Sequence, residues 1–487
     1  MAAWLHWFRR DLRLRDNAGL YAACQAGDAV AGIFVIDKRW FAADSNKIGP
    51  FQASFWLEAV AELARTLARH NINLHVLSAG DPVKAVVEFA QKLDVAGITF
   101  NKDYEPMQIA QDRRLSEQCE KLGIKCRGYK DAVGFEEFEI LTGSESPYTV
   151  FTPYKRAWLA KLTAQPQVPR GLPKKPTRVL TAGGKIPTAS SLGFKPVQLQ
   201  VATGESGGAR MLEFFCGEAV YAYQNERNFP AREGCSRLSA HLSCGTVSPR
   251  QCFEAVRAAQ SAAGRGKPLP GALAGCDTWL SELIWREFYK MILFHFPRTV
   301  NQAFQMRYAD IAWTNDAGAL ATWKNAATGY PIVDAAIKQI LATGWMHNRL
   351  RMIVAMFLTK DLDVDWRIGE QLFMQWLIDY DQAANVGGWQ WSAGTGNDAA
   401  PYFRVMNPIL QAQRYDPDGA FVRHWLPVLK DVPTKFVHEP WLMPPALQRD
   451  CRCVCGSDYP KPVVDHAAAR LRAIARFKPD KPPGADR

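Results

Sequence analysis

AVAGIFVID (residues 29–37), FQASFWLEAVAELARTLARH (51–70) and INLHVLS (72–78) follow one another in the first third of the chain and decide its fold. The first and third segments are short apolar runs, which predict buried strands. The segment between them repeats apolar residues at helical spacing, which predicts an amphipathic helix. Buried strands that alternate with helices indicate a parallel sheet covered on both faces.

The same alternation continues on both sides of this stretch. AWLHWF (3–8), AGITFN (96–101) and GIKCRGY (123–129) are further short strand-like runs. We therefore predict an α/β fold, in which a doubly wound, Rossmann-like parallel sheet occupies residues 1–131.

The composition changes after this domain. QPQVPRGLPKKPTRVLTAGGKIPTASSLG (165–193) is rich in Pro, Gly, Ser and Thr. Because it shows neither helical nor strand periodicity, we predict an interdomain linker over residues 132–210. Beyond the linker, apolar positions recur at spacings of three and four, with Pro or Gly at the joins. This pattern predicts a second, all-α domain over residues 211–480.

The charge of the chain points to a class of partner. Lys and Arg outnumber Asp and Glu by 59 to 48, which gives a formal charge of +11. A basic protein favours a polyanionic partner through counterion release, so nucleic acid is the leading class. A merely basic soluble enzyme is the alternative.

The cysteines and the N-terminus indicate the compartment. The 11 cysteines show no repeating spacing, which fits reduced thiols better than a disulfide framework. CRCVCG (451–456) lacks the spacing of a structural zinc site, so we predict no metal there. The first residues reverse the order of a secretory signal, and no apolar run is long enough to span a bilayer. We predict a cytoplasmic protein without a membrane partner.

Two segments place aromatic and polar residues on one helical face. Trp279, Glu282 and Trp285 fall at spacings of three, with Tyr289 four residues further on. A carboxylate between two indoles needs a partner if it is buried. The alternative is a boundary helix with Glu282 at its wet edge.

A second face repeats this design in GWMHNRLRM (344–352). Trp345, Asn348 and Met352 fall at spacings of three and four, so we predict that they share a helix face suited to a flat heterocycle. A packed core face is the alternative.

A third segment, REGCSRLSAHLSCG (232–245), predicts a helix start. Ser236 is the predicted N-cap, with Arg237 and Ser239 near first-turn amides that could receive a phosphate. Ordinary helix capping explains the same residues. No Walker-type loop, nucleophile elbow or His-Glu-x-x-His helix is present in the chain.

Eight segments together closely resemble the DNA photolyase and cryptochrome family, and nearest to them is the class I branch that repairs cyclobutane pyrimidine dimers. They are WFRRDLRLRDN (7–17), PYTVFTPYKRAW (147–158), SRLSAHLSCGTVSPRQ (236–251), WLSELIWREFY (279–289), GYPIVDAAIKQILATGWMHNRLRM (329–352), FLTKDLDVDWRIGE (357–370), DYDQAANVGGWQWSAGTGNDAAPYFR (379–404) and YPKPVVDHAAAR (459–470). The resemblance implies an α/β domain joined by a long linker to a helical domain that holds reduced FAD.

The resemblance assigns roles in FAD binding. Asn385 matches the position facing flavin N5, while Asp379 and Asp381 match residues that bind the flavin ring and ribose region. An amide cannot supply a proton as a carboxylic acid can, so Asn385 should favour the anionic reduced flavin. Further implied FAD contacts are Tyr223, Cys235, Ser236, Arg237, Leu238, Ser239, Trp279, Glu282, Trp345, Asn348 and Arg351. Cys235 stands where relatives usually have Thr, so no hydroxyl is available there.

The resemblance also implies the electron path and the substrate. Trp389, Trp366 and Trp313 match a relay that carries an electron from the surface to the photoexcited flavin. The pocket for a flipped-out dimer is matched by Glu282, Trp285, Asn348, Met352 and Trp391, and DNA phosphates are matched by Arg227, Arg349 and Arg404. The implied catalytic residues are Glu282, Asn385 and the three relay tryptophans.

The resemblance leaves three other branches as alternatives. A cryptochrome photoreceptor would typically replace Asn385 or add a long C-terminal extension. A (6-4) photolyase would carry a His-His pair where this chain has His347 and Asn348. The DASH branch, which prefers single strands, ranks third. We therefore expect dimer-containing DNA as the partner of a monomer that needs no protein partner.

A second, antenna chromophore is also implied. Folate-binding relatives carry an Asn-Glu pair and a Cys-Lys pair where this chain has Met107 and Gln108, then Val300 and Asn301. These departures disfavour a pterin in its usual mode. Deazaflavin, a second flavin and an empty pocket remain open.

Overall fold

The structure is a computed structural model and describes residues 2–264, 271–399, 401 and 404–478. The chain divides into two compact units. Unit 1 comprises Met1–Asn225, Cys235–Pro297 and Met374–Ala384, and unit 2 comprises Glu226–Gly234, Arg298–Phe373 and Asn385–Arg487.

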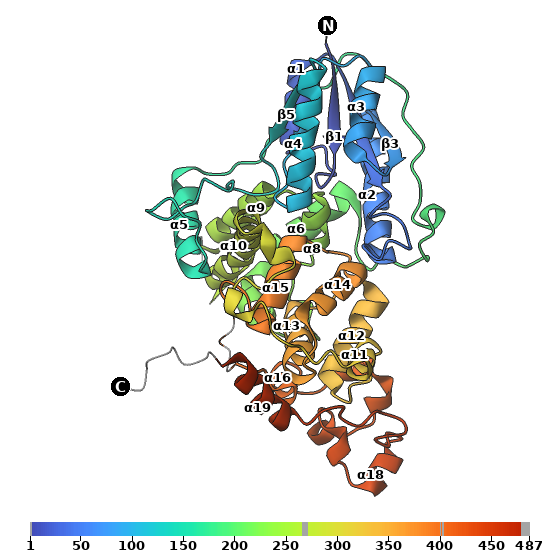
Figure 1. Ribbon diagram of the computed structural model, residues 1–487, viewed down its shortest axis with the longest axis vertical. Helices are drawn as coiled ribbons and strands as arrows, with labels where there is room; N and C mark the ends of the chain where they lie inside the picture. Colours follow the sequence, from blue (N-terminus) through green and yellow to red (C-terminus); the bar gives the residue numbers. More distant parts are fainter. Residues whose placement is uncertain (1, 265–270, 400, 402–403, 479–487) are drawn as a thin grey trace. The chain divides into compact units, whose positions relative to one another are not determined.

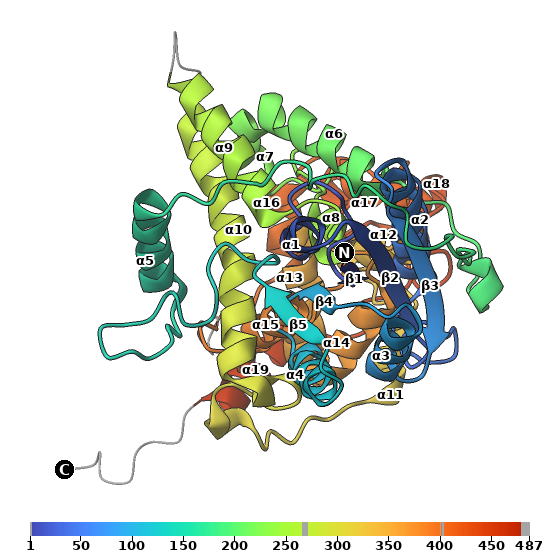
Figure 2. The same ribbon diagram turned by 90° about the horizontal axis from the view of Figure 1, so that it is seen from above.

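Unit 1 contains a five-stranded parallel sheet, of which Figure 1 labels β1, β3 and β5. The strand order is β3-β2-β1-β4-β5, and all five strands are labelled in Figure 2. Its strands are β1 (Ala3–Phe8), β2 (Ala29–Asp37), β3 (Asn73–Ala79), β4 (Gly97–Asn101) and β5 (Lys125–Tyr129). Strand β2 is buried at every residue, as its unbroken apolar run predicts.

Helices cover both faces of this sheet (Figure 2). They are α1 (Ala18–Ala26) and α2 (Pro50–Arg69) on one face, and α3 (Pro82–Lys92) and α4 (Pro106–Lys121) on the other. Alternate residues of β1 point to opposite faces, so Leu5 and Trp7 join the core with Val86 of α3 and Leu115 of α4. The prediction of a doubly wound α/β fold is confirmed.

The rest of the chain is helical. The α-helices are α5 (Phe151–Ala164), α6 (Gly204–Gly217), α7 (Tyr223–Glu226), α8 (Ser239–Cys244), α9 (Pro249–Ala263), α10 (Ala272–His295), α11 (Ala317–Lys324), α12 (Pro331–Thr343), α13 (Asn348–Met356), α14 (Trp366–Trp376), α15 (Gln382–Ala393), α16 (Pro408–Tyr415), α17 (Ala420–Trp425), α18 (Pro445–Asp450) and α19 (His466–Phe477). A π-helical turn, η5 (Phe357–Asp361), follows α13.

Seven short 3-10 turns complete the helical elements of the described residues. They are η1 (Ser190–Leu192), η2 (Ala219–Ala222), η3 (Pro297–Val300), η4 (Met306–Tyr308), η6 (Pro427–Leu429), η7 (Thr434–Phe436) and η8 (Pro440–Leu442). Across the described residues, no helix has both the length and the apolar content needed to cross a bilayer.

Helix α6 begins inside the segment predicted to be irregular. It starts at Gly204 rather than near residue 211, because the carboxylate of Glu62 in α2 accepts a hydrogen bond from Ser206 N at 2.8 Å. A Cβ at residue 204 would overlap that carboxylate, so glycine allows the close approach. This tertiary cap cannot be read from the local pattern of the sequence.

Candidate functional site

Helix α10 holds an aromatic platform in unit 1. Trp285 stacks on Phe151 with ring centroids 3.6 Å apart and planes within 10°. Phe288 meets Trp285 edge-on at 5.6 Å. These contacts fix the plane of the half-buried Trp285 indole. Glu282, one helical turn earlier, is also half-buried, so α10 presents a carboxylate beside an oriented ring.

A second aromatic cluster in unit 1 joins two of the predicted FAD contacts. Phe215 of α6 meets Tyr223 edge-on at 5.6 Å and Trp279 at 5.0 Å. All three rings are buried. The cluster therefore fixes the start of α7 against α10.

Asp381 is held as a buried carboxylate in unit 1. Its Oδ2 lies 2.8 Å from Nζ of Lys290, which is 1% exposed. Burial opposes ionisation, but Lys290, Arg286 and Arg10 together hold the pKa of Asp381 below its usual range. Its Oδ1 accepts from Ala384 N at 3.1 Å and so caps the start of α15. The neighbouring Asp379 is also buried.

Residues 235–239 form a turn before α8 rather than a helix start. Helix α8 begins at Ser239 with Leu238 as its N-cap, and no side chain caps it. The prediction that Ser236 is an N-cap is wrong, because Arg237 adopts a left-handed backbone with φ 52° and interrupts the helix. The Ser236 hydroxyl accepts from Leu238 N at 3.4 Å. Cys235 is half-buried in the same turn.

Asn385 of α15 is oriented by Glu370 of α14, both in unit 2. Its Nδ2 lies 3.1 Å from the Glu370 carbonyl oxygen and 3.0 Å from Oε1. Because a carbonyl oxygen can only accept, the amide nitrogen must be the donor in this pair. Both hydrogens of the Asn385 amide are thereby used, and Oδ1 remains to accept from a ligand.

The predicted relay tryptophans lie in unit 2. Trp389 is buried, and its ring centroid lies 5.0 Å from that of Phe373 and 6.4 Å from that of Trp323. Trp366, also buried, is the first residue of α14. Trp313 is half-buried, and its ring lies 5.8 Å from that of Phe477.

The 344–352 segment differs from its prediction. Gly344 ends α12 with φ 70°, and α13 begins only at Asn348, so Trp345 lies between the two helices. The prediction that Trp345 shares a helix face with Asn348 and Met352 is wrong, because the left-handed glycine stops the first helix. Asn348 and Met352 do lie one turn apart on α13.

Other predicted residues in this region of unit 2 differ in exposure. His347 caps α13, accepting from Arg349 N at 3.1 Å, and burial lowers the pKa of His347 to about 4. Arg349 donates to Asn228 Oδ1 at 2.6 Å and lies over the Tyr415 ring. Half-buried residues are Arg227, Arg351 and Trp391, and Arg404 is exposed.

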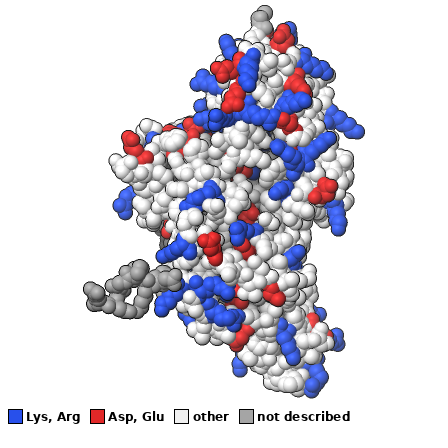
Figure 3. All heavy atoms as spheres, in the orientation of Figure 1, with Lys and Arg blue, Asp and Glu red and all other residues white. Residues whose placement is uncertain are grey.

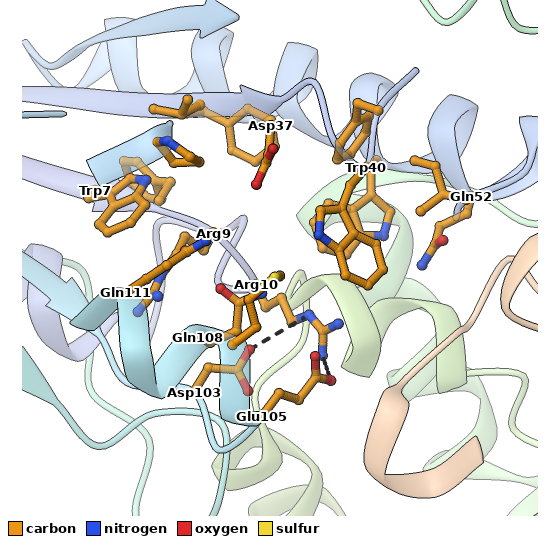
Figure 4. A pocket seen from close by; sticks show the side chains of 18 of the residues that line it. Trp7, Arg9, Arg10, Asp37, Trp40, Gln52, Asp103, Glu105, Gln108 and Gln111 are labelled. Atoms are coloured by element: carbon orange, nitrogen blue, oxygen red, sulfur yellow. Dashed lines mark hydrogen bonds and ion pairs between the residues drawn. The ribbon is translucent and has the colours of Figure 1, made fainter. Parts of the chain in front are cut away.

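A pocket lies at the carboxyl edge of the sheet in unit 1 (Figure 4). It encloses about 780 Å³ of empty space, including its open mouth. Rings from several segments line it: Trp7, Phe8, Phe34, Trp40, Phe41, Trp56 and Tyr380. Met107 and Gln108, which stand at the antenna positions in the sequence, also line it. The family resemblance indicated only Met107 and Gln108, and the other lining residues are dispersed along the chain, so no local pattern predicts them.

Comparisons with known proteins agree with these features. Family models described as DNA photolyase and as the FAD binding domain of DNA photolyase match residues 4–174 and 279–479. The deoxyribodipyrimidine photo-lyase of Salmonella typhimurium is 39% identical over 487 residues, covering 98% of this chain and 99% of that protein.

Solved structures give the same result. A class III photolyase from Agrobacterium tumefaciens matches with a TM-score of 0.89 and 32% identity, covering 98% of this chain and 97% of that one. An archaeal photolyase from Sulfolobus tokodaii, solved with two FAD molecules, matches with a TM-score of 0.79 and 29% identity, covering 98% and 99%. The predicted family is confirmed, and this chain belongs to the DNA photolyase family.

Proposed function

We propose that the protein is a deoxyribodipyrimidine photo-lyase, which uses light to split cyclobutane pyrimidine dimers in DNA. The strongest support is its 39% identity, over nearly the whole of both chains, to a protein of that name. The helix α10 platform of Glu282 and Trp285 supports the same function, because a rigid dimer needs an aromatic plane and a polar group at the pyrimidine edges.

The residues at the predicted FAD positions fit that cofactor. Asn385 presents an oxygen acceptor, and Asp381 is held ionised, which suits the ring N–H groups and sugar hydroxyls of a flavin. Arg237 and Arg351 carry the positive charge that a pyrophosphate needs. The chemistry FAD supplies when bound and reduced is a light-driven, reversible electron donation that splits the cyclobutane ring.

In this proposal the chain prepares the lesion for that chemistry. Phe151 holds Trp285 in one plane, so the indole is already oriented when a dimer arrives. Extruding a base pair costs a few kcal/mol, and less for a poorly stacked lesion, which favours damaged sites. Glu282, Asn348, Met352 and Trp391 complete the proposed set of lesion contacts.

Contacts to the DNA backbone come from basic side chains. Lys and Arg are spread over the face drawn in Figure 3, interspersed with fewer acids. Arg227, Arg349 and Arg404 are the proposed phosphate contacts, and Arg349 is oriented for this role by Asn228. We place the enzyme in the cytoplasm as a monomer that needs no protein partner.

The pocket of unit 1 is the proposed site of a second chromophore of flavin type. Its aromatic rings can stack on a flat heterocycle, and polar side chains among them can fix its orientation. The Sulfolobus tokodaii relative, solved with two FAD molecules, supports a second flavin in this family.

Binding to damaged DNA tests the function. We expect the FAD-containing protein to bind a thymine-dimer oligonucleotide more tightly than the intact oligonucleotide, measured by fluorescence anisotropy. Trp285→Ala should remove this preference and keep the affinity for intact DNA, while Trp425→Phe, in α17, serves as the control. Equal binding of both oligonucleotides by the unaltered protein would favour the photoreceptor alternative.

A further inference from the structure

Lys360 is a buried lysine of unit 2 that lies outside the proposed FAD, lesion and DNA contacts. It belongs to the π-helical turn η5 and is 4% exposed. Its Nζ has no hydrogen-bond partner among the described residues. A buried ammonium without a partner is costly, and such groups are concentrated at functional sites, as π-helical turns are. Both features make Lys360 a candidate functional group.

The aromatic cluster that Lys360 faces contains Trp313, the half-buried tryptophan of the predicted relay. Nζ of Lys360 lies 3.0 Å from the ring centroid of Phe477, the last residue of α19. The same Phe477 centroid lies 5.8 Å from that of Trp313. The Lys360 nitrogen and the Trp313 indole are therefore neighbours of one ring. Tyr308 completes the cluster, with its ring 5.5 Å from Phe477 and its hydroxyl donating to the Phe477 carbonyl oxygen at 3.1 Å.

The interior of this cluster is shielded from water. Phe477 is 1% exposed, and Ala303 and Tyr308 are buried against it. Two charges interact several times more strongly in such surroundings than in water, and salt screens them less. A positive charge on Lys360 is therefore felt at the Trp313 indole.

The charged groups around η5 do not neutralise Lys360. Asp363 attracts it, but the Asp363 carboxylate also lies 2.6 Å from Arg476 of α19. Within η5, Asp361 is paired with His466 of α19 at 2.5 Å. The remaining groups near the cluster are further cations, Arg472 near Asp361 and Arg307 over the Tyr308 ring.

The charge of Lys360 changes near neutral pH. Burial lowers the pKa of Lys360 to about 7, and the attraction of Asp363 opposes this only in part. Because the pKa is lowered, the ammonium dominates below pH 7 and the neutral amine above it. An ammonium disfavours a second positive charge nearby, whereas a neutral amine does not.

We propose that the charge of Lys360 controls the oxidation of Trp313: the ammonium suppresses electron donation by this tryptophan, and the neutral amine permits it. One electron passes from Trp313 through Trp366 and Trp389 to photoexcited FAD and leaves a cation radical on Trp313. Without an added thiol reductant the electron returns by the same path, and no atom is transferred. Lys360 is thus a positioning residue that acts through Trp313. The inference rests on the proposed function, because it needs the relay and bound FAD.

The pH profile of tryptophan oxidation tests the proposal. A laser flash excites the FAD-containing protein at about pH 6 and about pH 8, one unit on either side of the pKa of Lys360. Transient absorbance then records how much oxidised tryptophan survives. The surviving yield should rise at least about threefold from the lower to the higher pH. A yield that stays constant or falls would overturn the proposal.

Variants assign the pH dependence to one side chain. Lys360→Met removes the charge from an apolar site and should give the high yield at both pH values. Lys360→Arg keeps the charge over this range and should give the low yield at both. Should the larger arginine prevent folding, Lys360→Met alone decides. The matched control, Lys435→Met, removes an exposed charge over the Phe436 ring and should keep the pH dependence.

His466 is the competing origin of the pH dependence, because histidine as a residue type can change charge near neutral pH. It pairs with Asp361 in the same turn as Lys360. If the pH dependence survives in Lys360→Met, it belongs to another group such as His466, and the proposal fails. Loss of the dependence in Lys435→Met as well would assign it to net charge and would also overturn the proposal.

Dimer repair separates this inference from the proposed function. Chemically reduced Lys360→Met should repair a dimer-containing oligonucleotide as well as the unaltered protein does at both pH values, because repair by reduced protein does not use Trp313. Intact repair without any signal from oxidised tryptophan in the unaltered protein would overturn the inference and keep the proposed function. Absence of both repair and the tryptophan signal would overturn both.

Discussion

Three tryptophans line the pocket of unit 1, and the three predicted relay tryptophans lie in unit 2, but Trp389 of the second set is packed differently from the first set. Trp7, Trp40 and Trp56 border a pocket of about 780 Å³, a volume that includes its open mouth. In contrast, Trp389 is enclosed by Phe373 and Trp323, and a Cβ at residue 369 would overlap its indole. The same residue type therefore forms an open stacking surface in one unit and a filled aromatic core in the other.

This difference separates two uses of tryptophan. Open rings suit the binding of a flat ligand. Closely packed rings suit electron transfer through the protein, because close packing fixes the positions of the rings and excludes water. The predictions below test each half of this comparison, from the largest expected effect to the smallest.

Replacing Trp313, the half-buried tryptophan of the predicted relay, should have the largest effect on activity. Trp313→Phe should abolish light-driven reduction of the flavin, because phenylalanine is much harder to oxidise than tryptophan. Repair by chemically reduced protein should persist. Absorbance of the flavin under blue light measures the first activity, and Trp425→Phe is the control. Loss of both activities together would contradict the relay assignment.

The second-largest effect is expected on stability, from a buried lysine in unit 2. Lys360, 4% exposed, lies in the π-helical turn η5 with Nζ 3.0 Å from the Phe477 ring centroid. Its Nζ has no hydrogen-bond partner among the described residues, and Asp363, which also pairs with Arg476, gives only partial compensation. Burial lowers the pKa of Lys360 to about 7.

Lys360→Met should therefore stabilise the protein. Because the folded pKa lies below the unfolded value of 10.5, the cost of burying the ammonium is complete below pH 7 and disappears as the pH rises to 10.5. The gain should be about 3 kcal/mol near pH 6 and smaller near pH 9 in chemical denaturation. Lys435, exposed over the Phe436 ring, provides the control Lys435→Met. A pH-independent gain would contradict the assigned charge.

The packing of Trp389 gives a somewhat smaller effect. Gly369→Ala should destabilise the protein by about 2 kcal/mol, because the added methyl group overlaps the indole and both helices must shift. Gly217→Ala is the control, since no atom lies near that position at the end of α6. Chemical denaturation measures both. Equal stability of the two variants would show that the ring at Trp389 is loosely packed.

The pocket half of the comparison predicts the smallest effect. Trp40→Ala should weaken riboflavin binding about tenfold, because one stacking plane of the pocket is lost. Phe138→Ala removes an exposed ring outside the pocket and should leave the affinity unchanged. If both variants bind like the unaltered protein, Trp40 does not contact the ligand.

Local sequence pattern predicts the sheet well and the sites less well. The run at 29–37 and its flanking strands are recognisable because every residue of β2 is buried and its one charged residue, Asp37, stands at the end of the strand. The helical spacing of Trp345, Asn348 and Met352 predicted one shared helix face, but Gly344 adopts a left-handed backbone and ends α12 before Trp345. Ser236 was predicted to cap a helix, but Arg237 adopts a left-handed backbone and delays the start of that helix.

Tertiary contacts account for what the sequence does not predict. The pocket gathers residues from Trp7 to Tyr380, so no window of sequence contains it. Likewise, the orientation of the Asn385 amide depends on Glu370 in the preceding helix. Family motifs indicate which residues belong to a site, and tertiary packing determines how their side chains are oriented.

The central claim is that the FAD-containing protein repairs cyclobutane dimers with light, and one measurement tests it most directly. Photoreduced protein is mixed with a thymine-dimer oligonucleotide, and the ultraviolet absorbance of the restored thymines is followed in blue light and in darkness. The account predicts that absorbance recovers in the light only. An oligonucleotide that stays unrepaired in the light, while the protein retains reduced FAD, would contradict it.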